Sequence, residues 1–359
     1  MRRYRPDTPA ARLRDAHAHA RARRATRLPI RVALGSSLTV CLAALVGVAV
    51  TAPGATTARH SDPGASAVGA ATSPTASSPP DGRVADPLRL VRPLPAGWVE
   101  VGPLVATAVA DAADAGHELA ACVMAIDSPD ERVVCAGGDE PRYAASVIKV
   151  AYAVGALEAW EADPSAQTPY GRLGDLLEAA ITVSDNDAAN VLYDLSVDGP
   201  AAPDTTDPVS ALGDIADRVG LAEQFHTGGA FRYEWTGDWS HVTPRGSVRY
   251  LAELVRAADG RAPQGEALTS PAVARIVLDA MLAQERRWKL PDRLPAGTVA
   301  NKTGETDTES HDIAVVNTAS GRYAIAVIAS ADGMSNGPDV VTADLGHDVV
   351  TALGGAVRF

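Results

Sequence analysis

The first 95 residues are not suited to forming a packed core, which assigns the folded part of the chain to residues 96–359. Residues 53–95 are rich in Pro, Ser, Thr, Ala and Gly and hold almost no large apolar side chains. Such a segment buries too little apolar surface to offset the entropy lost on ordering, so we predict a disordered linker. The remaining 264 residues are enough for one α/β domain with a sizeable core.

A basic segment and an uncharged apolar segment precede the linker. Residues 1–31 contain ten Arg and two Asp, whereas the 21 residues 32–52 carry no charge. That length can cross a bilayer as a helix, and a basic flank stays on the cytoplasmic side. We therefore expect a basic cytoplasmic segment, a single-pass anchor at 32–52 and an extracytoplasmic domain. A cleaved signal peptide, which would release the protein, is the alternative.

The charge balance argues against a nucleic-acid partner. The whole chain carries −12 and residues 1–31 carry +8, so the rest carries −20. An acidic remainder does not favour nucleic-acid binding. The sequence shows no cluster with metal-ligand spacing and indicates no protein partner, so we expect a monomer without metal or other cofactor.

Two cysteines, Cys122 and Cys135, flank a turn at 128–130 between two short apolar runs. A hairpin with that turn would place them nearly opposite each other. In an oxidising compartment they could form a disulfide. Two buried thiols in a strand pair are the alternative.

The order of helix and strand patterns predicts an α/β fold. A helix at 103–116 precedes strands at 119–127 and 131–136, and a buried helix is expected at 146–160. An antiparallel sheet with helices packed on it, plus a helical subdomain inserted between its strands, fits the complete order. The later elements are helices at 174–183, 186–197, 207–219, 245–258 and 271–284, strands at 297–303, 312–318 and 322–330, and a helix at 338–352.

Ser146 and Lys149 lie one turn apart on the same face of the predicted helix at 146–160. A serine hydroxyl needs a nearby base to act as a nucleophile, and a lysine can supply it if burial lowers its pKa. The N–H groups at a helix start also favour a developing oxyanion. By chance alone, Ser-x-x-Lys is expected about once in a chain of this length, so a helix cap followed by an ordinary lysine is the alternative.

Two further motifs follow in chain order, Ser-Asp-Asn at 184–186 and Lys-Thr-Gly at 302–304. Alone, the first is a good helix N-cap cluster and the second a polar strand end. Together, the three motifs are the active-site set of penicillin-binding proteins and serine β-lactamases. The chain most resembles class A β-lactamases, over nearly all of 96–359. The matching segments include Asn190, Thr243-Pro244 and the run 311–316.

The resemblance implies a β-lactamase/transpeptidase-like fold, a three-layer sandwich of an antiparallel sheet flanked by helices, with an all-α subdomain. It also implies a role for each matching residue. Ser146 is acylated, Lys149 takes or relays its proton, and Ser184 passes a proton to the leaving nitrogen. The substrate contacts it implies are Asn186 with the amide side chain, Lys302, Thr303 and Gly304 at the carboxylate, and the backbone N–H groups of Ser146 and Glu305 as the oxyanion hole.

The sequence departs from the family pattern in two places, the omega loop and Glu305. Class A enzymes carry Glu-x-x-Leu-Asn in the omega loop, and its Glu activates the deacylating water. Residues 220–244 contain no such element; Glu234 and Asp238 are candidates for the base, and a loop carboxylate paired with Arg232 or left in solvent is the alternative. The carboxylate of Glu305 would repel a substrate carboxylate unless it turns away or is countered. His311 is a possible counter, or a strand histidine without a ligand role.

Three functions are therefore compared. The first is a membrane-anchored serine hydrolase, β-lactamase-like, that opens a β-lactam through an acyl-enzyme on Ser146. The second is a D-alanyl-D-alanine carboxypeptidase or penicillin-binding protein that acts on cell-wall peptides and deacylates slowly. The third is a non-catalytic cell-wall-binding domain, which the three intact motifs disfavour.

Overall fold

The computed structural model describes residues 93–128, 130–231, 238–263, 265–330 and 337–359. The predicted segments 1–31 and 32–52, nearly all of the predicted linker, and Glu234 lie outside these residues. No helix within the described ranges has the length and apolar character needed to span a membrane.

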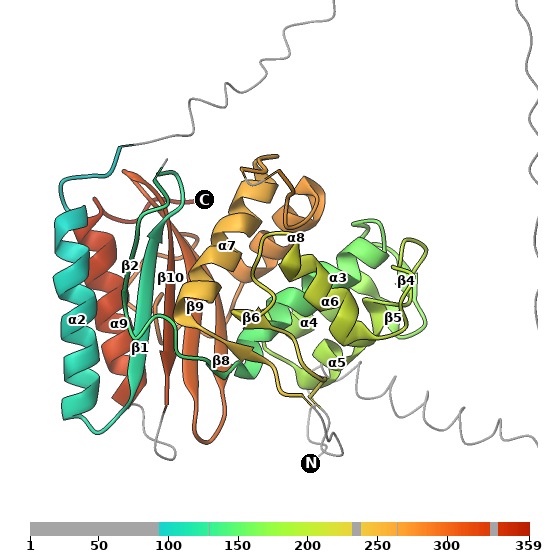
Figure 1. The fold of residues 1–359 in the computed structure, drawn as a ribbon, viewed down its shortest axis with the longest axis horizontal. Coiled ribbons are helices and arrows are strands. Elements are labelled where there is room, and N and C mark those ends of the chain that lie inside the picture. The colour runs from blue at the N-terminus through green and yellow to red at the C-terminus, as the bar shows by residue number, and fades with distance from the viewer. Residues whose placement is uncertain (1–92, 129, 232–237, 264, 331–336) are drawn as a thin grey trace, which may run out of the picture. The chain divides into compact units, whose positions relative to one another are not determined.

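A five-stranded antiparallel sheet forms the centre of the described domain (Figure 1). The strand order is β2-β1-β10-β9-β8, so the first two strands along the chain pair with the last three. The bounds are β1 (Leu119–Ala125), β2 (Val133–Ala136), β8 (Val299–Glu305), β9 (Ser310–Thr318) and β10 (Gly321–Ala329). The helical block therefore lies in the connection between β2 and β8.

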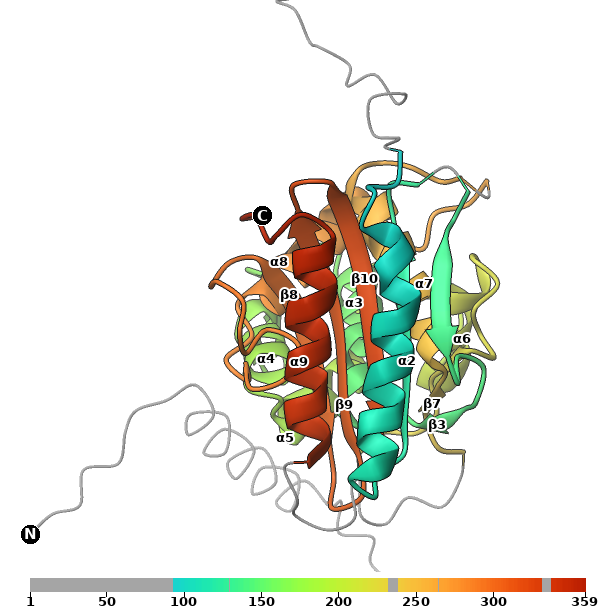
Figure 2. The same cartoon turned by 90° about the vertical axis from the view of Figure 1, so that its left-hand side faces the viewer.

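Helices α2 (Trp98–Asp114) and α9 (Gly337–Ala352) lie side by side on one face of the sheet (Figure 2). Helix α2 buries one stripe, Val101, Val105, Ala108 and Ala112, at the spacing of a helix with one apolar face. The strands alternate in the same way. In β1, Ala121, Val123 and Ala125 pack in the core under these two helices, whereas Cys122 and Met124 belong to the core on the other face.

The opposite face of the sheet carries the remaining helices (Figure 1). Helix α7 (Pro244–Ala258) packs on β1 and β10, and α8 (Pro271–Leu282) packs on β8. The all-α subdomain contains α3 (Lys149–Ala159), α4 (Leu173–Thr182), α5 (Asn186–Leu195) and α6 (Pro208–Asp217). The predicted three-layer α/β fold with an all-α subdomain is confirmed. One local difference is that residues 145–148, predicted in part as helix, form a 3-10 turn, η2 (Ala145–Ile148), before α3.

Short strands complete the fold. β3 (Arg142–Tyr143), β7 (His241–Val242) and β6 (Phe225–His226) form a small antiparallel sheet, and β3 leads directly into η2. A second pair, β4 (Gln167–Thr168) and β5 (Gly171–Arg172), lies before α4.

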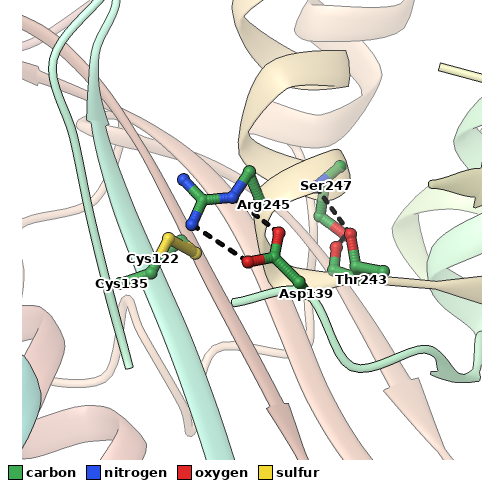
Figure 3. The surroundings of a disulfide bond; sticks show 7 residues. Cys122, Cys135, Asp139, Thr243, Arg245 and Ser247 are labelled. Carbon is green, nitrogen blue, oxygen red and sulfur yellow. Dashed lines mark hydrogen bonds and ion pairs between the residues drawn. A yellow bond between two sulfur atoms is a disulfide. The ribbon is translucent and has the colours of Figure 1, made fainter. Parts of the chain in front are cut away.

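A disulfide joins Cys122 and Cys135, which the β1–β2 register places directly opposite each other (Figure 3). The chain after β2 packs tightly against it, because a Cβ at Gly138 would lie 2.7 Å from the Cβ of Cys135. From there, Asp139 accepts a hydrogen bond of 2.7 Å from Arg245 near the start of α7. The disulfide thus belongs to a chain of contacts that connects the sheet edge to α7.

Candidate active site

The half-buried Ser146 lies in η2, at the junction between the small sheet and helix α3. The preceding residue, Ala145, has a φ of 45°, a left-handed conformation that costs a residue with a side chain about 1–3 kcal/mol. Strand β8 passes close to this turn, since a Cβ at Gly304 would lie 3.1 Å from Val147 and 3.2 Å from the carbonyl oxygen of Ala144. Glycine at 304 therefore lets the strand approach the serine turn.

Lys149 is fully buried one turn after Ser146, and its Nζ is surrounded by oxygens of the Ser-Asp-Asn segment. It donates to the carbonyl oxygen of Ser184 at 2.8 Å and to the side-chain oxygen of Asn186 at 2.6 Å. The Oγ of Ser184 lies 3.3 Å away and the carbonyl oxygen of Asp185 lies 3.4 Å away. None of these four partners is a carboxylate, so the contacts are dipolar rather than ionic.

Burial lowers the pKa of Lys149 from 10.5 to about 7. The carboxylate of Asp185 opposes this shift, and the positive charge of Arg286 adds to it. Near neutral pH, a large fraction of Lys149 is therefore an uncharged amine that can accept a proton. That is the property a base for Ser146 requires.

Lys302 also contacts Ser184. Its Nζ donates to Ser184 Oγ at 2.9 Å and to the carbonyl oxygen of Thr303 at 2.8 Å. The side chain is fully buried, and burial together with the charge of Lys149 holds its pKa well below the ordinary value. Ser184 Oγ thus lies between two lysine amines.

The backbone around Ser184 is held in an uncommon conformation, with a φ of 63° at this residue. Helix α5 begins directly afterwards, and the side chain of Asp185 caps it by accepting from the backbone N–H of Ala188 at 2.8 Å. The cap fixes the turn that directs Ser184 and Asn186 toward Lys149. Asn186 is exposed, and because its Oδ1 accepts from Lys149, its amide N–H groups are available to a substrate.

Thr303 adds an unpaired polar atom to this region. Its side chain is fully buried, and its Oγ1 has no hydrogen-bond partner within the described part of the chain. Buried hydroxyls are normally hydrogen-bonded, so a ligand atom is one way to satisfy this one.

The carboxylate of Glu305 is countered by two cations that the sequence did not predict. It contacts Arg286, and Lys289 Nζ donates to it at 3.0 Å. Burial alone would raise the pKa of Glu305, but Lys289 and Arg286 outweigh that effect and keep its pKa below the ordinary value. The repulsion expected for a substrate carboxylate is correspondingly reduced.

The proposed counter-ion role of His311 does not agree with the structure. Its Nε2 donates to the carbonyl oxygen of Tyr143 at 2.9 Å, and its Nδ1 accepts from the backbone N–H of Ala329 at 3.1 Å. Although Glu309 lies 3.4 Å from Nε2, complete burial lowers the pKa of His311 to about 4. A neutral ring with both nitrogens hydrogen-bonded cannot neutralise a carboxylate. The alternative, a strand histidine without a ligand role, agrees with these contacts.

Asn190 does not reach the lysines but holds the backbone of Phe231. Its side-chain amide donates to the carbonyl oxygen of Phe231 at 2.9 Å and accepts from the N–H of the same residue at 2.7 Å. The ring of Phe231 lies over Lys149, with the Nζ 5.0 Å from the ring centre, and packs near Tyr152. An aromatic ring therefore occupies one side of Lys149.

The second candidate base, Asp238, is described and points elsewhere. It is exposed, and its carboxylate contacts Nε2 of His226 in the small sheet rather than Lys149. Glu234, the first candidate, falls outside the described residues.

The profile of the β-lactamase enzyme family matches residues 164–353, more than half of the chain. The chain belongs to this family. It is therefore a β-lactamase-like hydrolase, and its fold agrees with that of solved members. No curated protein sequence matches the chain.

Two solved structures illustrate the agreement. The β-lactamase from Sphaerobacter thermophilus DSM 20745 has 20% identity and a TM-score of 0.55, covering 70% of this chain and 97% of its own. An ancestral class A β-lactamase, representing the last common ancestor of Gram-negative bacteria, has 23% identity and a TM-score of 0.54. That match covers 69% of this chain and 99% of the ancestral one. At these identities the likeness establishes the fold alone.

Three residues near this β-lactamase-like site were not predicted from the sequence: Phe231, Arg286 and Lys289. Each reaches the motif residues from a connecting segment outside the helices and strands. None of them lies at a sequence distance from the motifs that would identify it as a site residue.

Proposed function

We propose that the chain is an extracytoplasmic serine hydrolase that opens a β-lactam amide through an acyl-enzyme on Ser146. The observation that carries this proposal is the line of polar contacts from Lys149 Nζ through Ser184 Oγ to Lys302 Nζ. Lys149 itself lies one helical turn from Ser146. Two buried lysines with lowered pKa values around one serine form a path along which a proton can move.

Acylation takes two steps, and each of them moves protons. In the first step, Ser146 Oγ attacks the amide carbonyl carbon while its proton passes to the neutral amine of Lys149. The carbonyl oxygen becomes an oxyanion, for which the backbone N–H groups of Ser146 and Glu305 are the proposed donors. In the second step the carbon–nitrogen bond breaks, and the nitrogen takes a proton from Ser184, which regains one from Lys302 or Lys149.

The substrate would be held by three groups beside this path. The amide N–H groups of Asn186 suit the acyl side chain, since its oxygen already accepts from Lys149. The Nζ N–H groups of Lys302 and the hydroxyl of Thr303, which has no partner among the described residues, can donate hydrogen bonds to a carboxylate.

A second candidate, a penicillin-binding protein or D-alanyl-D-alanine carboxypeptidase with slow deacylation, is favoured by Phe231. Release of the acyl group needs a base that activates water near the ester. The ring of Phe231 covers one side of Lys149, and the hydrogen-bond partners of Lys149 within the described ranges include no carboxylate. The two candidates share acylation of Ser146 and differ in how long the ester lasts.

One experiment separates them. The full chain is mixed with a chromogenic cephalosporin or a fluorescent penicillin, and both turnover and intact mass are followed. A Ser146→Ala variant is the control and should give neither adduct nor turnover. Rapid steady turnover supports the β-lactamase function, and a persistent adduct supports the slow-deacylating one. Absence of any adduct and any turnover with the unaltered chain refutes both.

A substitution at Phe231 tests the reason for slow release. If the ring excludes a base, Phe231→Glu should shorten the lifetime of the adduct by at least about tenfold, because it supplies a carboxylate there. Phe231→Gln is the matched control of equal size without the charge. Equal adduct lifetimes in the two variants would remove Phe231 from the explanation.

The extracytoplasmic location rests on the uncharged run 32–52 behind an Arg-rich start and on the Cys122–Cys135 disulfide. Disulfides persist in oxidising compartments. Protease treatment of intact cells, followed by N-terminal sequencing of the membrane and medium fractions, tests this placement. Digestion only after lysis would refute it, and the sequenced N-terminus distinguishes an anchor from a cleaved signal.

A further inference from the structure

The small sheet β3–β7–β6 brings together three side chains of metal-binding type: His226, Asp238 and His241. His226 and His241 lie directly opposite each other in the antiparallel pair β6–β7, so their rings project from the same face. Asp238 reaches this face from the segment just before β7. One ligand atom from each residue lies within 4.8 Å of the others.

The contacts within the trio suit a shared cation. His226 Nε2 is in contact with a carboxylate oxygen of Asp238, and the two rings are stacked with centres 4.5 Å apart. His241 Nδ1 lies 3.3 Å from the carbonyl oxygen of Trp239. If Nδ1 donates this hydrogen bond, Nε2 keeps its lone pair, which is the usual arrangement of a metal-binding histidine.

The backbone under the trio is held firmly, whereas its side chains have room to adjust. Gly229 N–H donates to the carbonyl oxygen of Asp238 at 3.0 Å, and Gly228 N–H donates to Ser240 Oγ at 2.9 Å. A Cβ at Gly228 would lie 2.4 Å from the same carbonyl oxygen, so glycine is needed for this approach. The side chain of Asp238 is 59% exposed and can rotate toward a cation.

We propose that His226, Asp238 and His241 form a binding site for a zinc-type divalent cation at the base of the segment between β6 and β7. Two imidazole nitrogens and one carboxylate oxygen are typical zinc ligands, and water would complete a tetrahedral shell. Ligand atoms in such a shell lie about 3.3 Å apart, a spacing that the trio can reach by side-chain rotations. The cation joins both ends of the segment that carries Phe231 and stabilises the small sheet before Ser146. This site is independent of the acylation chemistry.

The test uses the full chain after treatment with a chelator. Titration with zinc chloride in a calorimeter should show one equivalent bound, and His226→Ala and His241→Ala should each weaken binding by at least about tenfold. The matched control is His347→Ala. His347 is an exposed histidine with an adjacent carboxylate, Asp348, and lies outside the trio. This variant should bind zinc like the unaltered chain.

A second measurement does not depend on the variants folding. Cobalt added to the unaltered chain should give the strong visible absorption of a tetrahedral site, and zinc should abolish it. No saturable zinc uptake by the unaltered chain would overturn the proposal. Undiminished uptake by folded His226→Ala and His241→Ala variants, or an octahedral cobalt spectrum, would do the same.

Discussion

The pH dependence of Ser146 acylation should report the state of Lys149. Burial lowers the pKa of this lysine from 10.5 to about 7. At pH 7 about half of it is then neutral, against about 3 in 10,000 for an ordinary lysine, a difference of roughly 1,600-fold in free amine. If the neutral amine is the base, as proposed, the acylation rate should rise about tenfold per pH unit below 7 and level off above it. Between pH 5 and 9 the total rise is about 100-fold.

A substitution at Asp185 tests the cause of this profile. The charge of Asp185 raises the pKa of Lys149, so its removal should lower that pKa further and move the midpoint toward acid by about one pH unit. Asp185→Asn suits the test because asparagine also caps a helix, which keeps the bond to Ala188 N–H and the start of α5.

The assay mixes the full chain with a fluorescent penicillin, quenches at intervals and measures the acylated fraction by intact mass from pH 5 to 10. Circular dichroism at each pH confirms that the chain stays folded. Since Lys149 and Lys302 interact, the midpoint belongs to the pair rather than to one lysine. A rate that is independent of pH, or one that still rises above pH 9, would refute Lys149 as the base. An unchanged midpoint in Asp185→Asn would refute the electrostatic reasoning.

Three further predictions concern the scaffold around the site. Removing the disulfide with Cys122→Ala and Cys135→Ala should lower the free energy of unfolding by about 3 kcal/mol, since the bond closes a loop of 13 residues. Urea denaturation measures this, and a loss below about 1 kcal/mol would contradict it. Asn190→Ala should lower the same quantity by about 1–3 kcal/mol, because two hydrogen bonds to the backbone of Phe231 are lost. An unchanged urea midpoint would show that these bonds add nothing. Gly304→Ala should slow acylation by at least about tenfold, because the new methyl group pushes β8 away from the serine turn. An unchanged acylation rate would mean that the serine turn accommodates the methyl group without any displacement of β8.

Most of the fold followed from local patterns. The predicted strand at 322–330 corresponds to β10 at Gly321–Ala329, and the predicted helix at 245–258 to α7 at Pro244–Ala258. Apolar periodicity and capping residues are local signals, so element types can be read from sequence. The opposition of Cys122 and Cys135 followed from the same reasoning, because a hairpin brings its two strands into register, whereas the bond between them was one of two alternatives that the structure decided.

The surroundings of the motifs could not be read in this way. The sequence suggests His311 as a possible counter-ion for a carboxylate, but this residue of β9 is completely buried. The partners of Glu305 and the ring over Lys149 come from connecting segments. Their positions depend on how those segments pack, and no periodicity encodes that packing.

The sequence by itself determined which reactive residues the chain holds and which of them share a helical turn. Ser146 and Lys149 are neighbours because of helix geometry alone. Tertiary structure decided the rest. It brings Ser184 to Lys149 across 35 residues and to Lys302 across 118, and it removes both lysines from water. Proton affinity depends on burial and on neighbouring charges, so the lowered pKa that the proposed role of Lys149 requires arises only when distant segments pack around it.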